Sequence, residues 1–465
     1  MKTNLIASAA LGILFSSCKL VGPNHTVPKS EAASAYKNAS GEFSSRMDKR
    51  WWRVFGDEKL NSLMADLEKG NFDLRAAEAR RYQAYAALGV DRSRLAPEVL
   101  SNTSATRNRG SENARGGAGG GALETYYTQY HIGMSLGYEL DLWGRVRRIV
   151  EAGTANAEAA AVSVDQVKLS LQAQLARSYF ALRFLDSEAA VLNEALGSRQ
   201  ESLNLAKDRF EGGKTSELDV ARAESEMAAT RAQLVAIQSP RAALENAIAV
   251  LAGKNASNFS IPADPITDTA PRVPAGSPMQ LLGRRPDVFF AERKLAASSA
   301  KIGVAEADFY PRISLIGTGG LSSINSSTFL KRSSSEFSIG PQVDLPLFQG
   351  LRRKADFALA KEQHEEALAN YQQTVLTAFA DVENALAARR GASNEVAAQN
   401  DSIAAAQKSF DLSNVRYKEG VSSYLEVVDS QRELLNAQRS EVLARGRAYE
   451  GTVLLLQALG GGFSK

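Results

Sequence analysis

The chain of 465 residues repeats itself at an offset of about 207 residues, and this duplication limits the possible folds more than any other feature. The offset aligns residues 209–213 (RFEGG) with residues 416–420 (RYKEG), and it places Gly253 on Gly460. A long fixed period means that one supersecondary unit is used twice. Every element predicted in one half should therefore recur in the other.

Each copy contains a pair of segments whose hydrophobic residues alternate with polar or small ones, which predicts β-strands. The alternation runs through residues 130–141 in the first copy and through residues 337–347 in the second. Weaker companion segments precede them at residues 99–107 and 313–321, across loops rich in Gly and Ser. The sequence thus predicts two hairpins and four strands.

Strands of this length with one apolar face and aromatic ends are typical of transmembrane barrels, although a half-buried sheet of a soluble protein has the same alternation. After the N-terminal leader, no stretch reaches the 18 or so consecutive apolar residues of a membrane helix, so a membrane crossing would have to be made of strands. Four strands cannot close a barrel, and lipid does not tolerate an open sheet edge. We therefore expect the chain to oligomerise.

Downstream of each strand pair the hydrophobic period becomes helical. No proline interrupts residues 146–210 or 352–417, so each segment can form one helix of about 65 residues, roughly 95 to 100 Å long. Both helices end at a glycine turn, where Thr or Ser can cap the next helix.

Two returning helices are predicted after these turns, at residues 217–251 and 423–459, and each has roughly half the length of the helix before it. Entry helices predicted at residues 58–95 and 286–307 would stack on the returning helices and supply the missing half. Pro286 and Asp287 fit a helix start, since proline suits the first turn and a carboxylate suits the positive end of the dipole.

The first 17 residues predict a secretory signal peptide, because one positive charge at Lys2 precedes an apolar run from Leu5 to Phe15. Cys18 is the only cysteine, and it stands where a bacterial lipoprotein signal is cut and the new terminal cysteine acylated. We expect a covalent lipid on Cys18. The alternative is an incidental cysteine behind an ordinary signal.

These features predict the following division of the chain: a signal peptide at residues 1–17, a lipidated N-terminal segment and equatorial belt at 18–56, a first repeat at 57–253, an equatorial linker at 254–286, a second repeat at 287–460 and a C-terminal tail at 461–465.

Composition argues against nucleic-acid binding and against catalysis. The 55 basic and 52 acidic residues give a net charge of +3, with no dense basic tract. His25, His131 and His364 lie far apart in the sequence, and no metal-binding spacing surrounds them. The glycine-rich residues 116–121 lack the strand-to-helix context of a phosphate loop, so a flexible loop is the better interpretation. We expect no enzymatic activity, no metal and no cofactor other than the lipid.

Several short motifs occur in an order that resembles the outer membrane factor family, the TolC-like exit ducts of tripartite efflux pumps, in its NodT/OprM-type lipoprotein branch. The motifs are residues 21–24 (VGPN), Trp51 with Trp52, residues 281–288 (LLGRRPDV) and the segment from Tyr424 to Arg432. The resemblance covers essentially the whole mature chain.

The resemblance implies a mainly α fold with a membrane β part. Long antiparallel helical hairpins would form a periplasmic α-barrel, and four strands per chain would enter a trimeric, 12-stranded outer-membrane β-barrel. It also implies a homotrimer in the outer membrane that works as a passive duct with a periplasmic adaptor (membrane fusion protein) and an inner-membrane transporter of the RND type. The alternative is a periplasmic coiled-coil adaptor or structural lipoprotein without a pore.

The helix after the second turn carries two stripes. A heptad seam for packing on a neighbouring helix comprises Val421, Val428, Leu435, Val442 and Tyr449. About 100° away lie Leu425, Asp429 and Arg432, whose counterparts in the family help to close the periplasmic end of the duct. The alternative for Asp429 and Arg432 is an ordinary ion pair on a solvated helix face.

The matching positions of the first copy hold Leu218, Arg222 and Ser225, so only the second hairpin carries the whole gate set. We therefore expect the second hairpin to move and the first to stay fixed.

The two turns resemble the ends by which the family's ducts dock their adaptor, although simple helix capping would also explain their composition. The residues concerned are Gly213, Thr215 and Ser216 in the first turn and Gly420, Val421 and Ser422 in the second.

Overall fold

A computed structural model describes residues 20–28, 35–38, 48–109, 126–274, 278–281 and 283–463. The predicted signal peptide, the lipidation site Cys18 and the glycine-rich residues 116–121 lie outside these ranges. The chain divides into two compact units. Unit 1 comprises Met1–Pro28, Arg80–Ala160 and Ala291–Tyr371, and unit 2 comprises Lys29–Ala79, Ala161–Phe290 and Gln372–Lys465.

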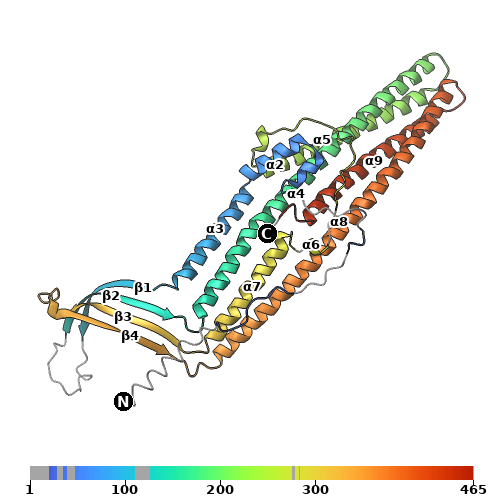
Figure 1. Ribbon diagram of the computed structural model, residues 1–465. Coiled ribbons are helices and arrows are strands. Elements are labelled where there is room, and N and C mark those ends of the chain that lie inside the picture. Colours follow the sequence, from blue (N-terminus) through green and yellow to red (C-terminus); the bar gives the residue numbers. More distant parts are fainter. Residues whose placement is uncertain are drawn as a thin grey trace. The chain divides into compact units, whose positions relative to one another are not determined.

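Unit 1 contains one antiparallel sheet with the strand order β1-β2-β3-β4 (Figure 1). The strands are β1 (Glu98–Arg109), β2 (Tyr126–Leu140), β3 (Arg312–Ser323) and β4 (Ser335–Asp344). Pairing of β2 with β3 joins the two predicted hairpins into a single sheet. Among the described residues, the outer edges of β1 and β4 have no strand partner.

Strand β4 ends at Asp344, three residues before the predicted end at residue 347. Pro346 lacks the N–H that a continuing strand would donate, so the alternating pattern runs on past the point where pairing stops. The residues that follow leave Leu347 and Phe348 about nine-tenths exposed, at 90% and 87%. The expectation that this stretch is strand was wrong.

The N-terminal residues 20–25 of unit 1 lie on the start of α4 (Arg145–Glu211), held by the buried side chain of Arg148. The Arg148 guanidinium donates to the carbonyls of Val21 and Gly22 and to Oδ1 of Asn24, each at 3.0 Å. Gly22, at φ 88°, packs so closely on Gly303 that a Cβ would lie 2.4 Å from the Gly303 Cα. In the sequence, residues 21–24 were recognised only as a family motif. The structure shows that they contact Arg148 and Gly303.

Unit 1 also holds a buried ionic group around Glu292, in α7 (Pro286–Ala307). His25 Nε2 lies 2.7 Å from the Glu292 carboxylate, and Arg293 binds that carboxylate and Glu158. Burial opposes the charged form, but the hydrogen bonds from Arg293 and His25 lower the pKa of Glu292. Residues 20–25 are thus fixed to the rest of unit 1 at two points, by Arg148 and by Glu292.

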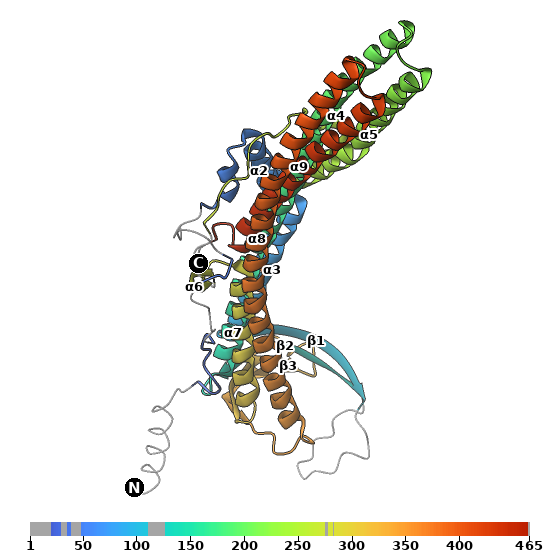
Figure 2. The same ribbon diagram turned by 90° about the vertical axis from the view of Figure 1, so that its right-hand side faces the viewer.

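Two helical hairpins lie side by side in unit 2, with their turns at the same end (Figures 1 and 2). The hairpins are formed by α4 with α5 (Glu217–Leu251) and by α8 (Arg352–Lys418) with α9 (Tyr424–Ala458). Both α4 and α8 have 67 residues and both α5 and α9 have 35, which agrees with the predicted lengths.

The first entry helix is broken at Asn71, so the prediction of one helix over residues 58–95 was wrong. The chain forms α2 (Glu58–Gly70) and α3 (Phe72–Ser93) instead. Asn71 Oδ1 accepts from the Leu74 amide at 2.9 Å, as an N-cap residue does, and its Nδ2 donates to the carbonyl of Leu251. The break therefore joins the start of α3 to the end of α5.

The two returning helices end in the same way. Gly253 and Gly460 have φ angles of 68° and 90°, and each amide donates to the carbonyl three residues earlier. A Cβ at Gly253 would lie 2.2 Å from the Gly70 carbonyl oxygen, and one at Gly460 would lie 1.9 Å from that of Arg284. The second returning helix thus ends against the region where its entry helix α7 begins, as predicted, whereas the first ends at the break between α2 and α3.

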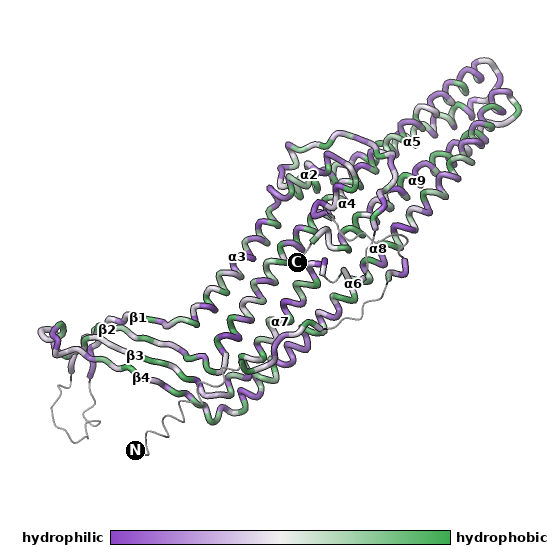
Figure 3. The backbone as a smooth tube through the Cα atoms, in the orientation of Figure 1, coloured by the Kyte–Doolittle hydropathy of each residue, from purple (hydrophilic) through white to green (hydrophobic). Residues whose placement is uncertain are grey.

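The remaining short elements are η1 (Trp51–Phe55), η3 (Ala256–Asn258), α6 (Pro278–Leu281) and η4 (Arg332–Ser334). In the described part of the chain, no helix is both long enough and apolar enough to cross a membrane. Hydrophobic and hydrophilic residues are interspersed along the long helices (Figure 3).

Candidate functional site

The two helix turns of unit 2 share one backbone conformation. Gly213 has φ 68° and Gly420 has φ 79°, the left-handed region that glycine enters without a steric penalty. In each turn the glycine amide donates to the carbonyl three residues earlier and the next amide donates to the carbonyl five residues earlier, at 2.8 to 3.0 Å. This is the Schellman arrangement, and it satisfies the last carbonyls of α4 and α8.

The hydroxyl residues of the turns do not cap the following helices as predicted. Ser216 and Ser423 occupy the N-cap positions of α5 and α9, yet neither side chain makes the capping hydrogen bond. Thr215 Oγ1 instead bonds to the carboxylate of Asp219, and the buried Oγ of Ser422 has no partner among the described atoms. Capping alone therefore does not account for these side chains.

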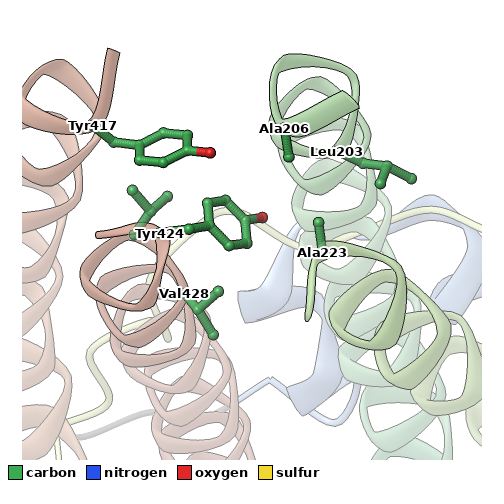
Figure 4. Close-up of a cluster of buried hydrophobic side chains, with 7 residues drawn as sticks. Leu203, Ala206, Ala223, Tyr417, Tyr424 and Val428 are labelled. Carbon is green, nitrogen blue, oxygen red and sulfur yellow. The ribbon is translucent and has the colours of Figure 1, made fainter. Parts of the chain in front are cut away.

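A hydrophobic cluster behind the turns, here called the tip cluster, packs the two hairpins against each other (Figure 4). The rings of Tyr417 and Tyr424 pack with 5.2 Å between their centroids and an angle of 56° between their planes, and their hydroxyls are directed toward the side of Ala206 and Ala223. Alanines at these positions leave room for the rings. The buried members are Leu203, Ala206, Ala223, Tyr417, Tyr424, Val427 and Val428.

Arg209 joins the end of α4 to the end of α8. Its guanidinium donates to the Lys418 carbonyl at 2.8 Å and lies 4.8 Å from the centre of the Tyr417 ring. The repeat counterpart Arg416 stays within its own hairpin, 3.7 Å from the carboxylate of Glu426. Two arginines at equivalent sequence positions thus have different partners.

The predicted packing seam on α9 is confirmed for four of its five members. Val428, Leu435, Val442 and Tyr449 are all buried. Val421 is 66% exposed because it lies in the turn before α9 begins at Tyr424. The prediction that Val421 belongs to the packing seam was wrong.

The three predicted gate residues lie on an exposed face of α9. Leu425 is 44% exposed, and the side chains of Asp429 and Arg432 are 60% and 55% exposed. Asp429 and Arg432 approach no closer than 3.8 Å, which is a loose pair. The tight partner of Arg432 lies elsewhere.

Arg432 binds Glu226 of α5 and so connects the two hairpins. Its Nε donates to Glu226 Oε1 at 3.0 Å, and its Nη2 donates to the same oxygen. The Glu226 side chain is only 11% exposed, so one end of this ion pair is buried. Ion pairs with a buried partner are screened less by salt than exposed ones.

On its other side Glu226 meets Arg199 of α4. Arg199 Nη1 lies 3.0 Å from Glu226 Oε2 and donates to the Glu226 backbone carbonyl at 2.6 Å and to the hydroxyl of Thr230. Thr230 Oγ1 in turn donates to the Glu226 carbonyl at 2.9 Å. We call Arg199, Glu226, Thr230 and Arg432 the Glu226 cluster.

The two arginines of the Glu226 cluster differ in their electrostatics. Hydrogen bonds to Glu226 raise the pKa of Arg432. Burial lowers the pKa of Arg199, with the Glu226 charge opposing and the Arg432 charge adding to this effect. The Glu226 carboxylate therefore lies between one buried and one exposed cation.

In the tip cluster, burial and the neighbouring Tyr417 raise the pKa of Tyr424 to about 12.

Sequence reasoning missed Glu226 and Arg199. The repeat alignment compares positions 207 apart, but Arg432 meets a residue that is not its repeat counterpart. That contact depends on how far α9 is shifted along its axis relative to α5, which the sequence alignment of the repeats does not give. The one available signal was that the first copy has Glu226 directly after Ser225, the counterpart of Arg432.

No group of three or more metal-ligating side chains occurs among the described residues. The hydrogen bonds, ion pairs and apolar contacts at and behind the turns hold the four helices of the two hairpins together.

Comparison with known proteins agrees with this geometry. A family model described as "Outer membrane efflux protein" matches residues 63–254 and 278–461, well over half of the chain. The chain is 32% identical over 482 aligned residues to the toluene efflux pump outer membrane protein TtgF of Pseudomonas putida, covering 100% of this chain and 98% of the relative.

Two solved structures are also similar. The outer-membrane channel OprN superposes with a TM-score of 0.88 at 32% identity, covering 95% of this chain and 99% of that one. The Campylobacter jejuni CmeC outer membrane channel gives 0.87 at 26% identity, covering 96% of both chains. The chain therefore belongs to the outer membrane efflux protein family, and its role is efflux through the outer membrane.

Proposed function

We propose that the chain forms a homotrimeric, passive exit duct, non-enzymatic in itself, in which three four-stranded sheets close a 12-stranded β-barrel and the helical hairpins form a periplasmic α-barrel. The observation that supports closure by further copies is that, among the described residues, the sheet has two edges without a strand partner, because unpaired backbone groups are costly in lipid. Pairing β4 of one copy with β1 of the next would remove both edges. The strongly exposed side chains of Phe337, Ile339 and Val343 suit an apolar surface.

We propose that Arg432 and Glu226 form the latch of the periplasmic gate, with Leu425 and Asp429 beside it. Support comes from the ion pair that joins α9 of the second hairpin to α5 of the first. Three-fold symmetry would repeat Leu425 as an apolar constriction and Asp429 as a carboxylate ring. Release of Arg432 would then free the second hairpin from the first.

The same proposal assigns partners. The turns with Gly213, Thr215 and Ser216 and with Gly420, Val421 and Ser422 would dock a periplasmic adaptor of the membrane fusion protein class. An inner-membrane transporter of the RND type would supply the energy. The exposed turns support docking, as does the name of TtgF as the outer membrane protein of a toluene efflux pump.

A covalent lipid on Cys18 completes the proposal. Residues 20–25, which follow it closely, are held on unit 1 by Arg148, so an acyl chain on Cys18 would be anchored near a fixed point of the fold.

Single-channel recording of the purified trimer in planar bilayers tests the gate. Arg432→Ala and Glu226→Gln should each raise the open probability by at least about fivefold, since an ion pair of this kind contributes about 1 kcal/mol and is repeated in each subunit. Leu425→Ala and Asp429→Ala should raise the conductance of the open and partly open states.

Arg447→Ala is the matched control, because Arg447 pairs with Glu395 inside the second hairpin. It should leave the open probability unchanged. If Arg432→Ala trimers conduct like the wild type, the latch is refuted. If the protein forms no conducting trimer at all, the duct proposal fails.

A further inference from the structure

We propose that Arg199 is a positioning residue of the gate: it fixes the Glu226 carboxylate in the orientation that Arg432 binds, so that opening separates Arg432 from Glu226 while Arg199 and Glu226 stay together. This inference rests on the proposed function of Arg432 and Glu226 as the latch. It assigns a role to a residue that does not line the exposed face of α9.

Burial separates the fixed part of the Glu226 cluster from the releasable part. The side chains of Arg199 and Glu226 are 6% and 11% exposed, whereas the Arg432 side chain is 55% exposed. Separating Arg432 from Glu226 returns the Arg432 cation to water. Separating Arg199 from Glu226 would leave a cation and an anion buried without partners, which is far more costly.

Hydrogen bonding makes the fixed part rigid. Arg199 holds Glu226 through the carboxylate and through the backbone carbonyl, and it also bonds to Thr230 one helical turn further along α5. These contacts tie α4 to α5 within the first hairpin and occupy Oε2, so Oε1 remains for Arg432. The Arg432 site is therefore formed before Arg432 arrives, and binding costs little reorganisation.

Nη1 of Arg199 makes all three contacts, to the Glu226 carbonyl, to Glu226 Oε2 and to the hydroxyl of Thr230. Lysine at position 199 would offer three donors on a shorter side chain, and burial lowers the pKa of an ammonium more readily than that of a guanidinium, so lysine would hold the carboxylate less well. The repeat counterpart of Arg199 is Ala406, so the second hairpin has no such cluster. The arrangement belongs to the first hairpin alone.

The test is a double-mutant cycle on open probability in planar bilayers, with Arg199→Met, Arg432→Ala and the double variant. Arg199→Met should raise the open probability by roughly threefold in the otherwise native trimer, and by less than about 1.5-fold when Arg432 is already alanine. Arg199→Lys should recover only part of the native value.

Glu188→Gln provides the control for additivity. Glu188 of α4 binds Arg439 of α9 at 2.5 and 2.9 Å, two turns further along α9 than Arg432. Its effect should be the same with and without Arg432, because the two sites share no partner.

The outcomes separate the two proposals. An unchanged Arg432→Ala trimer refutes the latch. If open probability rises in Arg432→Ala but not in folded Arg199→Met, the positioning role alone is refuted. An equal effect of Arg199→Met with and without Arg432 refutes it as well.

If Arg199→Met yields no folded trimer, Thr230→Val replaces it, because this variant removes one acceptor of Arg199. Thr230→Val must then raise the open probability of the native trimer and lose that effect in the Arg432→Ala background.

Discussion

The two hairpins share their backbone geometry at the turns and differ in the charges just behind them. Both turns have a left-handed glycine and the same two hydrogen bonds. Behind them, the first hairpin supplies the acid Glu226 and the second supplies the base Arg432, where the first has Ser225. The acid and the base stand at non-equivalent positions of the repeat, and only the second copy has a base at the position of Arg432, so this ion pair between the hairpins forms in one direction only.

A second contrast separates the repeats in unit 1, where each long helix begins. Arg148, at the start of α4, is 1% exposed and binds the N-terminal residues 21–24. Its counterpart Arg353, at the start of α8, only approaches the Pro346 carbonyl at 3.4 Å. The chain has one N-terminus for two equivalent sites, so only one site can be covered by it.

Substitution of Arg148 and Arg353 should give the largest difference in lost stability between the two repeats. Arg148→Met should lower the free energy of unfolding by about 3 kcal/mol, because three part-buried acceptors lose their donor. Arg353→Met should change it by less than about 0.5 kcal/mol. Urea unfolding of the detergent-solubilised protein measures both values, and equal losses would contradict the contrast.

A deletion of the contacted segment sharpens this comparison. Without residues 20–25, Arg148→Met should cost far less than in the full chain, because its main acceptors are gone. An undiminished cost would mean that Arg148 acts through other contacts.

Tyr424 should make stability depend on alkaline pH, whereas its counterpart Glu217 in the first repeat cannot. Burial raises the pKa of Tyr424 to about 12, above the value near 10 of an unfolded tyrosine. The folded state therefore favours the neutral phenol, so this contribution is complete below pH 10 and is lost as the pH rises through 12.

The stability difference between the wild type and Tyr424→Phe should accordingly shift by about 2 kcal/mol between pH 9 and pH 12, with the wild type losing more. Urea midpoints across this range measure the shift. A constant difference would show that the Tyr424 hydroxyl is not shielded from water.

Substitution of the two turn glycines should give the smallest difference in lost stability between the two repeats. Gly213→Ala and Gly420→Ala should each cost about 1 kcal/mol of stability, because both glycines have positive φ. A Cβ at Gly213 would meet nothing within 4 Å, and one at Gly420 would lie 3.4 Å from Nη2 of Arg209, an ordinary contact. Thermal unfolding should rank the two variants equally. If docking uses these turns, a larger side chain such as leucine at either glycine should abolish efflux while the trimer level is unchanged.

Local chemistry explains which parts of the fold could be predicted from sequence. The ends of α4 and α8 follow from uninterrupted helical periodicity and a following glycine, and they lie within about two residues of the expectation. The break at Asn71 was missed because an apolar period continues through it, although Asn is a good N-cap. The early end of β4 was missed because alternation persists where Pro346 prevents pairing.

By itself, the sequence determined the duplication, the long helical hairpins, the four strands and the stripe of Leu425, Asp429 and Arg432 on α9, because each depends on a local period or on residues next to one another in the chain. Only the tertiary structure decided that Arg432 binds Glu226, that Arg199 contacts the same carboxylate and that Arg148 holds the N-terminal segment. Those contacts join residues between 27 and 206 positions apart in sequence, and they depend on the axial register between packed helices and on the path of the N-terminal segment. No local period encodes either of these.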